Sequence, residues 1–269
     1  MGGLTATRLR TAHDQASLVR DLAALGLPAG RDVLIHCSLR RLGRVDGGPA
    51  ALLDAVREVI GPRATVVVPT QTADNSTTSR AFRVATEGMD AAGRAAYESA
   101  LKGFDRDATP SYGMGAFAEH VRRHPGAMRS AHPQTSFAAL GPRAESLTAG
   151  HLMESHLGEQ SPLAGLYAAG AVTLLLGVGY EACTALHLAE YRLRTPRPTR
   201  WYRCYVNVGG RRVGHDFLGA DLDDSSFPEL GAAMDGRPFV RRRAFGDAEA
   251  RLIDIRAAVD FAADWLSDR

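Results

Sequence analysis

Apolar and polar residues in the first seventy positions follow the helix period and the strand pattern in turn. Leu18, Leu22 and Leu25 recur at helical spacing, which predicts a helix. Asp14 before it is a candidate N-cap, and Gly26 after it is a stop signal. The next predicted elements are a strand at 33–35 that ends at 36–38, a helix at 50–60 that Pro49 opens and Gly61-Pro62 ends, and a strand at 65–68. This alternation predicts a layered α/β sheet.

The rest of the chain contains further periodic segments and one long exception. The predicted elements are helices at 114–123 and 142–150, a strand at 172–178, a helix at 184–193, a hairpin of 202–208 and 213–217 joined by Gly209-Gly210, a strand at 248–255 and a helix at 257–266. Residues 71–112 are polar and weakly periodic, so we expect a long loop there that is functional or mobile. Because no repeat or linker divides the chain, we predict one domain over residues 1–269.

The strongest candidate chemistry follows the predicted strand at 172–178. Gly177 and Gly179 allow a sharp turn, and the polar run after them opens a helix that carries His187. Open α/β sheets place their ligands just past such strand ends. Glu190 lies three residues further on, so a helix would bring both side chains to one face, as a general base with its carboxylate requires. Asp216 remains open as the alternative carboxylate, and an ordinary solvated helix face is the alternative to a catalytic role.

Composition and charge narrow the class of protein. Lys and Arg number 32 against 30 Asp and Glu, a net charge of +2, which gives no case for nucleic-acid binding. Cys37, Cys183 and Cys204 are odd in number and lack CxxC spacing, so no disulfide framework is expected. The N-terminus lacks an apolar signal region and no apolar run reaches membrane length, so we expect a cytoplasmic protein without membrane partners.

A candidate anion site follows the first predicted strand. His36-Cys37-Ser38-Leu39-Arg40 is followed by Arg44-Val45-Asp46-Gly47-Gly48 before a helix. The paired glycines permit close approach of the backbone, and the helix start offers free N–H groups, which suits a pyrophosphate. The pattern is neither a P-loop nor GxGxxG, and simple turn chemistry is the alternative.

Two more clusters of polar residues could line a ligand-binding site. Thr70, Thr72 and Asp74 follow the strand at 65–68, although a hydrogen-bonded turn explains them equally well. Asp216 and the run 221–224 could attract a cationic ligand, or an aspartate of that run could cap the helix after Ser225. A catalytic thiol is not favoured, since neither Cys37 nor Cys183 has a local hydrolase signature. His132, His151, His156 and His215 lack zinc-ligand spacing, so no metal site is predicted.

Motifs in a fixed order over nearly the whole chain resemble the aminoglycoside 3-N-acetyltransferase family, the antibiotic N-acetyltransferases that lack the GNAT fold. The matching stretches are 36–40 (HCSLR), 42–43, 45–48 (VDGG), 68–70 (VPT), 109–111 (TPS), 129–133 (RSAHP), 136–141 (SFAALG), 158, 161–163 (SPL), 175–180 (LLGVGY), 184 and 187–190 (HLAE). Cys37 stands where many relatives have serine. The resemblance implies a layered αβα fold with a central mixed sheet and a small extension of a β-hairpin and helices.

The resemblance also implies an activity and its residues. The expected reaction is acetyl-CoA-dependent acetylation of the 3-amino group of the 2-deoxystreptamine ring, which inactivates the antibiotic, with His187 as the base and Glu190 as its partner. The residues implied for CoA are His36, Cys37, Ser38, Leu39, Arg40, Val45, Gly47 and Gly48 near the phosphates, and Thr70, Thr72 and Ser111 along the pantetheine arm. Candidate carboxylates for the polycationic drug are Asp74, Glu154, Asp216, Asp223 and Asp224.

Three other functions remain open from the sequence. The acceptor could be an amine on another small metabolite, which would not require the acidic residues. A non-catalytic aminoglycoside-binding protein would need the acidic residues but not His187, and an amidase using Cys183 is a third option. The chain could act as a monomer or a homodimer.

Overall fold

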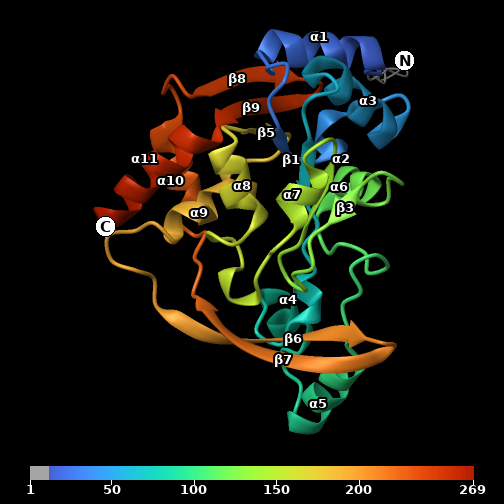
Figure 1. Ribbon diagram of the computed structural model, residues 1–269, viewed down its shortest axis with the longest axis vertical. Helices are drawn as coiled ribbons and strands as arrows, with labels where there is room; N and C mark the ends of the chain where they lie inside the picture. The colour runs from blue at the N-terminus through green and yellow to red at the C-terminus, as the bar shows by residue number, and fades with distance from the viewer. Residues whose placement is uncertain (1–11) are drawn as a thin grey trace, which may run out of the picture.

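The structure is a computed structural model that describes residues 12–269; residues 1–11, where we expected no secretion signal, lie outside it. Within the described range a seven-stranded sheet has the order β3-β4-β2-β1-β5-β9-β8 (Figure 1). The strands are β1 (Val33–Cys37), β2 (Val66–Pro69), β3 (Met128–Arg129), β4 (Phe137–Leu140), β5 (Val172–Leu176), β8 (Val240–Phe245) and β9 (Ala248–Asp254). β1 pairs in parallel with β2 and β5, and the outer pairings are antiparallel. The predicted mixed sheet is therefore confirmed.

Helices cover both faces of this sheet. One face packs against α1 (Gln15–Leu25), α3 (Gly48–Ile60) and α6 (Gly115–Arg122), and the other against α7 (Ala144–Thr148), α8 (Pro162–Ala168), α10 (Phe227–Met234) and α11 (Ile255–Ser267). Successive strand residues point to opposite faces, so Val33 and Ile35 join the first core while Leu34 joins the second. This is the predicted three-layer arrangement. No helix within residues 12–269 is long and apolar enough to cross a membrane.

The predicted caps form where the sequence places them. The Asp14 side chain accepts a hydrogen bond from the Ser17 N–H, and Gly26 ends α1 with φ +86°. Helix α3 includes Pro49 in its first turn and stops at Gly61. These signals are local, which explains why sequence alone located them.

The predicted hairpin is confirmed and is longer than expected. β6 (Thr199–Val208) and β7 (Arg211–Ala220) pair over their full length, and Gly209 and Gly210 both have positive φ, as the tight turn requires. The hairpin lies below the sheet in Figure 1. The side chain of Asn75 anchors it, since it donates to the Tyr205 carbonyl at 2.6 Å and accepts from the Tyr205 N–H at 2.9 Å.

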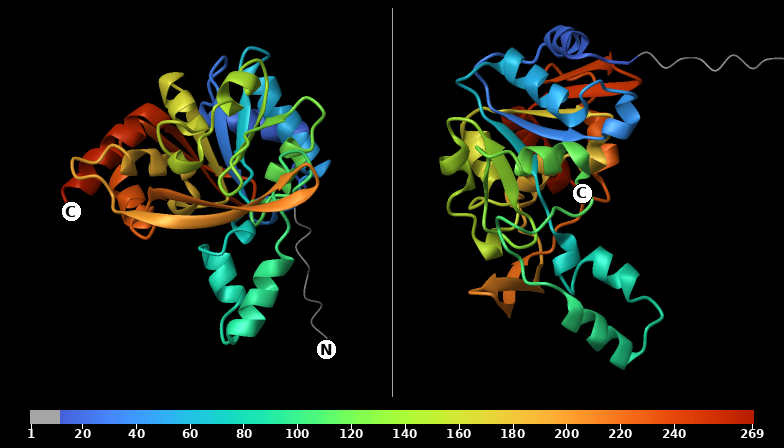
Figure 2. Two further views of the ribbon diagram at one scale, coloured as in Figure 1. Left: turned by 60° about the horizontal axis from the view of Figure 1, so that its bottom comes forward. Right: turned by 90° about the vertical axis from the view of Figure 1, so that its right-hand side faces the viewer.

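The prediction of a long loop at 71–112 is wrong. This segment contains the 3₁₀ turn η1 (Ala73–Asn75), α4 (Arg80–Ala85) and α5 (Ala91–Ala100), and Figure 2 shows the two helices projecting from the sheet. Ser79 and Asp90 cap them through side-chain hydrogen bonds. Helix α5 consists mostly of small and polar residues and buries none of them, so no stripe of large apolar residues marks it in the sequence.

Several elements were not predicted, and two predicted ones are shorter. The unpredicted elements are α2 (Leu39–Leu42), α8, β3, β4 and β8, whereas α10 is the helix expected after Ser225. The helix expected at 184–193 is a 3₁₀ turn, η4 (Thr184–Leu186), followed by the single turn α9 (His187–Glu190), and the strand expected at 172–178 stops at Leu176. Strand β8 ends the described sheet and carries Arg241, Arg242 and Arg243 in sequence, which hides a strand pattern.

Replacing Asn75 by alanine is expected to lower the free energy of unfolding by about 1–3 kcal/mol, because the buried Tyr205 N–H loses its partner and the Tyr205 carbonyl keeps only its bond from the Phe104 N–H. Urea unfolding measures this loss. The control is Asn207→Ala, which removes an exposed asparagine side chain from the same hairpin. Equal stability of the two variants would show that the Asn75 bonds do not anchor the hairpin.

Candidate active site

The carboxyl ends of the parallel strands β1, β2 and β5 face one cavity of about 650 Å³. Its walls come from these strand ends and the turns after them, the position expected for ligands in open α/β sheets. Its lining comprises Ile35, His36, Cys37, Ser38, Leu39, Arg40, Arg41, Pro69, Gln71, Gly113, Met114, Gly115, Ala116, Val178, Glu181, Ala182, Thr184, His187 and Asp224.

His187 and Glu190 meet at this cavity. The His187 Nδ1 lies 2.5 Å from Glu190 Oε2, and the His187 ring centroid is 4.8 Å from that of Phe227. The His187 side chain is 15% exposed, whereas that of Glu190 is fully buried. A neutral His187 that donates Nδ1–H to the carboxylate keeps the lone pair on Nε2 available for a proton. The expected i,i+3 geometry is thus present, and its catalytic use stays a prediction.

The second oxygen of Glu190 is also bonded. Oε1 accepts the Asp223 backbone N–H at 2.8 Å and lies 2.8 Å from the Arg197 guanidinium. Three partners from separate segments therefore hold the carboxylate in place. Sequence reasoning missed Arg197, which lies in the connection from α9 to β6 and has no motif around it. The alternative partner Asp216 does not reach His187, because both of its oxygens bind Arg203 at 2.7 Å on the hairpin.

His36, at the end of β1, lies in the same cavity wall. Its side chain is buried, and burial together with the nearby His187 lowers the pKa of His36 to about 3. Burial raises the pKa of the Cys37 and Cys183 thiols to about 12, so both stay protonated at neutral pH. Because the thiolate is the nucleophile, neither cysteine suits covalent catalysis.

The residues predicted for CoA fall into two groups. His36, Cys37, Ser38, Leu39 and Arg40 line the cavity, as predicted for one site. The others do not line it: Val45, Gly47 and Gly48 form the turn into α3, Thr70 and Thr72 are buried, and Ser111 lies before α6.

The hydroxyl groups of the second group are committed to internal hydrogen bonds. Thr70 Oγ1 accepts from Arg129, Thr72 Oγ1 donates to the Pro133 carbonyl, and Ser111 Oγ donates to Glu119. Contact of these hydroxyls with CoA stays a prediction.

Of the five predicted drug-binding carboxylates, Asp224 alone is among the cavity-lining residues. Asp223 is its neighbour, and its carboxylate accepts the Ser225 N–H at 2.9 Å. Neither caps the following helix, because Ser226 occupies the N-cap position of α10. The rest lie outside the lining: Asp74 in η1, Glu154 in the 3₁₀ turn η2 (Met153–Ser155), and Asp216 on β7. Gln71, the amide in the polar run after β2 that was expected to line a ligand-binding site, lines the cavity. Glu181 and Thr184 also line it and were not singled out as binding residues.

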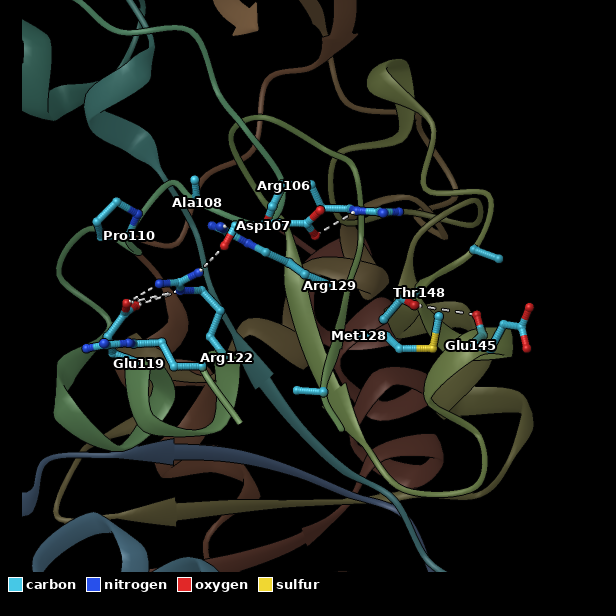
Figure 3. A pocket seen from close by; sticks show the side chains of 13 residues that line it. Arg106, Asp107, Ala108, Pro110, Glu119, Arg122, Met128, Arg129, Glu145 and Thr148 are labelled. Atoms are coloured by element: carbon cyan, nitrogen blue, oxygen red, sulfur yellow. Dashed lines mark hydrogen bonds and ion pairs between the residues drawn. The ribbon is translucent and has the colours of Figure 1, made fainter. Parts of the chain in front are cut away.

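A second cavity, of about 910 Å³, lies at the β3 edge of the sheet (Figure 3). Figure 3 shows Arg122 turned toward Glu119, and Arg129 reaching the loop that carries Arg106. Arg129 also donates to the Thr70 and Thr109 carbonyls, so it ties this loop to the sheet. These guanidinium groups are occupied by internal partners, and we assign this cavity no reaction. Within residues 12–269 no cluster of three or more His, Cys, Asp or Glu is placed to hold a metal.

Comparisons with known proteins show the family to which this chain is similar. The family model described as aminoglycoside 3-N-acetyltransferase matches residues 34–267. Aminoglycoside N(3)-acetyltransferase VII of Streptomyces paromomycinus is 36% identical over 94% of this chain and 91% of its own length.

Two solved structures extend the similarity to the fold. The crystal structure of the YokD protein from Bacillus subtilis has a TM-score of 0.88 at 31% identity and covers 96% of this chain and 95% of its own. AAC-IIIb, solved as a binary complex with CoASH, has a TM-score of 0.83 at 28% identity and covers 96% and 98% of the two chains.

Proposed function

This chain belongs to the aminoglycoside 3-N-acetyltransferase family, and from that premise we propose that it transfers the acetyl group of acetyl-CoA to the 3-amino group of the 2-deoxystreptamine ring of aminoglycosides. The observation that carries the proposal is the His187–Glu190 pair at the wall of a cavity large enough for ligand. The consequence for a cell would be antibiotic resistance. A cytoplasmic location is proposed with it, supported by three cysteines that are all free.

The proposed chemistry begins with deprotonation of the acceptor amine. An ammonium group has no lone pair, so His187 Nε2 accepts its proton while Glu190 stabilises the resulting imidazolium. The amine nitrogen then forms a bond to the thioester carbon, and the carbon–sulfur bond breaks. The nitrogen loses its second proton to the solvent as the amide forms, and the departing sulfur takes the proton held by His187. The products are the amide, CoA with a free thiol and one proton released to the solvent. No covalent enzyme intermediate is required.

CoA is proposed to bind where the predicted anion site meets the cavity. Ser38, Leu39 and Arg40 line the cavity, and the guanidinium groups of Arg40 and Arg41 supply positive charge for phosphates. Val45, Gly47 and Gly48 follow in the turn that leads to α3. The AAC-IIIb complex with CoASH supports CoA as the ligand.

Of the five carboxylates predicted for the drug, Asp224 is the one best placed to hold the cationic acceptor, since it lines the cavity together with His187. Its neighbour Asp223 is bonded through its backbone to Glu190, so the segment that carries Asp224 has a fixed position relative to the base. Asp74, Glu154, Asp216 and Asp223 remain proposed as outer contacts for other amines of the drug.

Asp224→Asn is expected to raise the KM for aminoglycosides about 10- to 100-fold, because a charge-assisted hydrogen bond is worth about 1.5–3 kcal/mol. The KM for acetyl-CoA should not change. Steady-state kinetics with each substrate varied in turn measures both values. The control is Asp21→Asn on α1, away from the cavity lining. An unchanged aminoglycoside KM in Asp224→Asn would remove Asp224 from the binding site.

The proposed function is tested by release of free thiol from acetyl-CoA in the presence of a panel of aminoglycosides. The product should gain the mass of one acetyl group, and NMR should place it on the nitrogen at ring position 3. Thiol release with another small amine instead would assign a different acceptor. Aminoglycoside binding without thiol release would make the chain a binding protein.

A further inference from the structure

We propose that His36 is a second catalytic residue, which donates a hydrogen bond to the carbonyl oxygen of the acetyl group during transfer. The inference rests on the proposed acetyl transfer and adds to it the group that stabilises the negative charge. That charge develops on the thioester oxygen when the amine attacks, and a positioned donor there lowers the barrier.

His36 lies near the end of β1, in the wall of the candidate active-site cavity. Strand β1 is flanked in parallel by β2 and β5, and His36 lies opposite Leu175 near its carboxyl end. Both His36 and His187 line the cavity, and the two imidazoles are close enough to interact electrostatically. A donor at His36 is therefore placed in the wall of the cavity in which the base would meet the thioester.

The hydrogen bonding of His36 is incomplete without a ligand. Its side chain is 6% exposed, and Nε2 is buried with no partner among residues 12–269. A buried polar atom left unpaired costs about 1–3 kcal/mol, and native proteins keep few of them. Leu34, two residues earlier, lies on the same face of β1 and belongs to the hydrophobic core. A hydrophobic side chain at position 36 would therefore fit this face of the strand without leaving a buried polar atom unpaired. An oxygen atom of a bound substrate would supply the missing partner.

The charge state of His36 fits a donor and not a base. With its pKa lowered to about 3 by burial and by His187, the ring is neutral at neutral pH and keeps one N–H group. A neutral donor is also the form compatible with its neighbour, because His187 becomes positively charged when it accepts the amine proton. A second positive charge in the same buried wall would oppose that step.

The test compares His36→Leu with His36→Gln. His36→Leu is expected to lower kcat by about 10²- to 10³-fold, the usual cost of removing one oxyanion donor, and His36→Gln should restore part of the loss because its amide can donate. The proposal moves His36 from the CoA contacts implied by the family resemblance to the acetyl oxygen. The dissociation constant for CoASH should therefore stay at the wild-type value, since CoASH has no acetyl oxygen. The Tm of His36→Leu should equal or exceed that of the wild type, because an unpaired polar group has been removed.

Two results would overturn the proposal. A kcat of His36→Leu within about twofold of wild type would show that the transition state makes no use of His36. A loss of CoASH affinity as large as the loss in kcat would assign His36 to the pantetheine arm instead. Thiol release by the wild type tests the proposed acetyl transfer, whereas the ratio of variant to wild-type kcat tests His36, so the two failures are distinguishable.

Discussion

His187→Ala is expected to lower kcat for aminoglycoside acetylation by about 10²- to 10⁴-fold, the range that general base catalysis contributes. The reason is that the ring nitrogen facing the cavity is the only group of the Glu190-bound imidazole free to take a proton from the amine. The KM values should change little, since positioning of both substrates depends on other residues. Steady-state measurement of thiol release gives kcat and the KM values. A thermal unfolding curve of the same variant shows whether it is folded.

The control for this variant is His124→Ala, which removes a histidine from the turn after α6 and leaves the cavity lining intact. Its kcat should match the wild type. Thermal stability of His187→Ala should stay close to wild type, because the ring is partly exposed and Glu190 keeps its bonds to Arg197 and Asp223. Acetylation at the wild-type rate by His187→Ala would remove the residue from the mechanism.

Lowering the pH from about 7 to about 5 is expected to remove about 2 kcal/mol of stability for each histidine that is buried in its neutral form. In the unfolded chain such a histidine binds a proton when the pH falls below its ordinary pKa of about 6.5. In the folded protein it binds a proton only at a much lower pH, because burial lowers its pKa. Its stabilising effect is complete above about pH 6.5 and declines as the pH falls toward the folded-state pKa. The groups concerned are His36, His132, His151 and His156, whose pKa values burial lowers.

The loss should accumulate over these histidines, three of which lie against one another, so stability is expected to fall as the pH goes from about 7 to about 5. Urea unfolding at several pH values measures the slope. His151→Gln should make the unfolding free energy depend less steeply on pH, by the contribution of one histidine. Glutamine can still donate to the His156 carbonyl but does not titrate. A stability that is flat between these pH values would contradict the buried neutral state.

Sequence located the elements whose signals are local. Asp14, Gly26 and Gly61 mark helix ends within one turn, and Gly209-Gly210 marks the hairpin without reference to the rest of the fold. The segment at 71–112 gave no such pattern, because α5 packs no buried residue against the core. Strand β8 was missed because only its two end residues are buried and three consecutive arginines lie between them. These arginines remove the alternation of apolar and polar residues that marks a strand.

In the candidate site too, sequence predicted the contact between neighbouring residues and missed those between distant segments. His187 and Glu190 are three residues apart, so helical geometry alone brings them together. Arg197 and the Asp223 N–H reach the same carboxylate from beyond α9 and from beyond the hairpin, and no local spacing encodes those contacts. The neutral state of His36 also depends on burial by elements distant in sequence.

The arginines of β8 have a consequence for the behaviour of many copies together. The backbone of an outer strand can pair with the same strand of a neighbouring molecule, which is how sheets polymerise. Arg241 and Arg243 are exposed along this strand, whereas Arg242 is paired with Asp235 and Glu249. Two such edges brought together would oppose the like charges of Arg241 and Arg243. Concentrated solutions of the protein should therefore resist strand-to-strand aggregation at this edge.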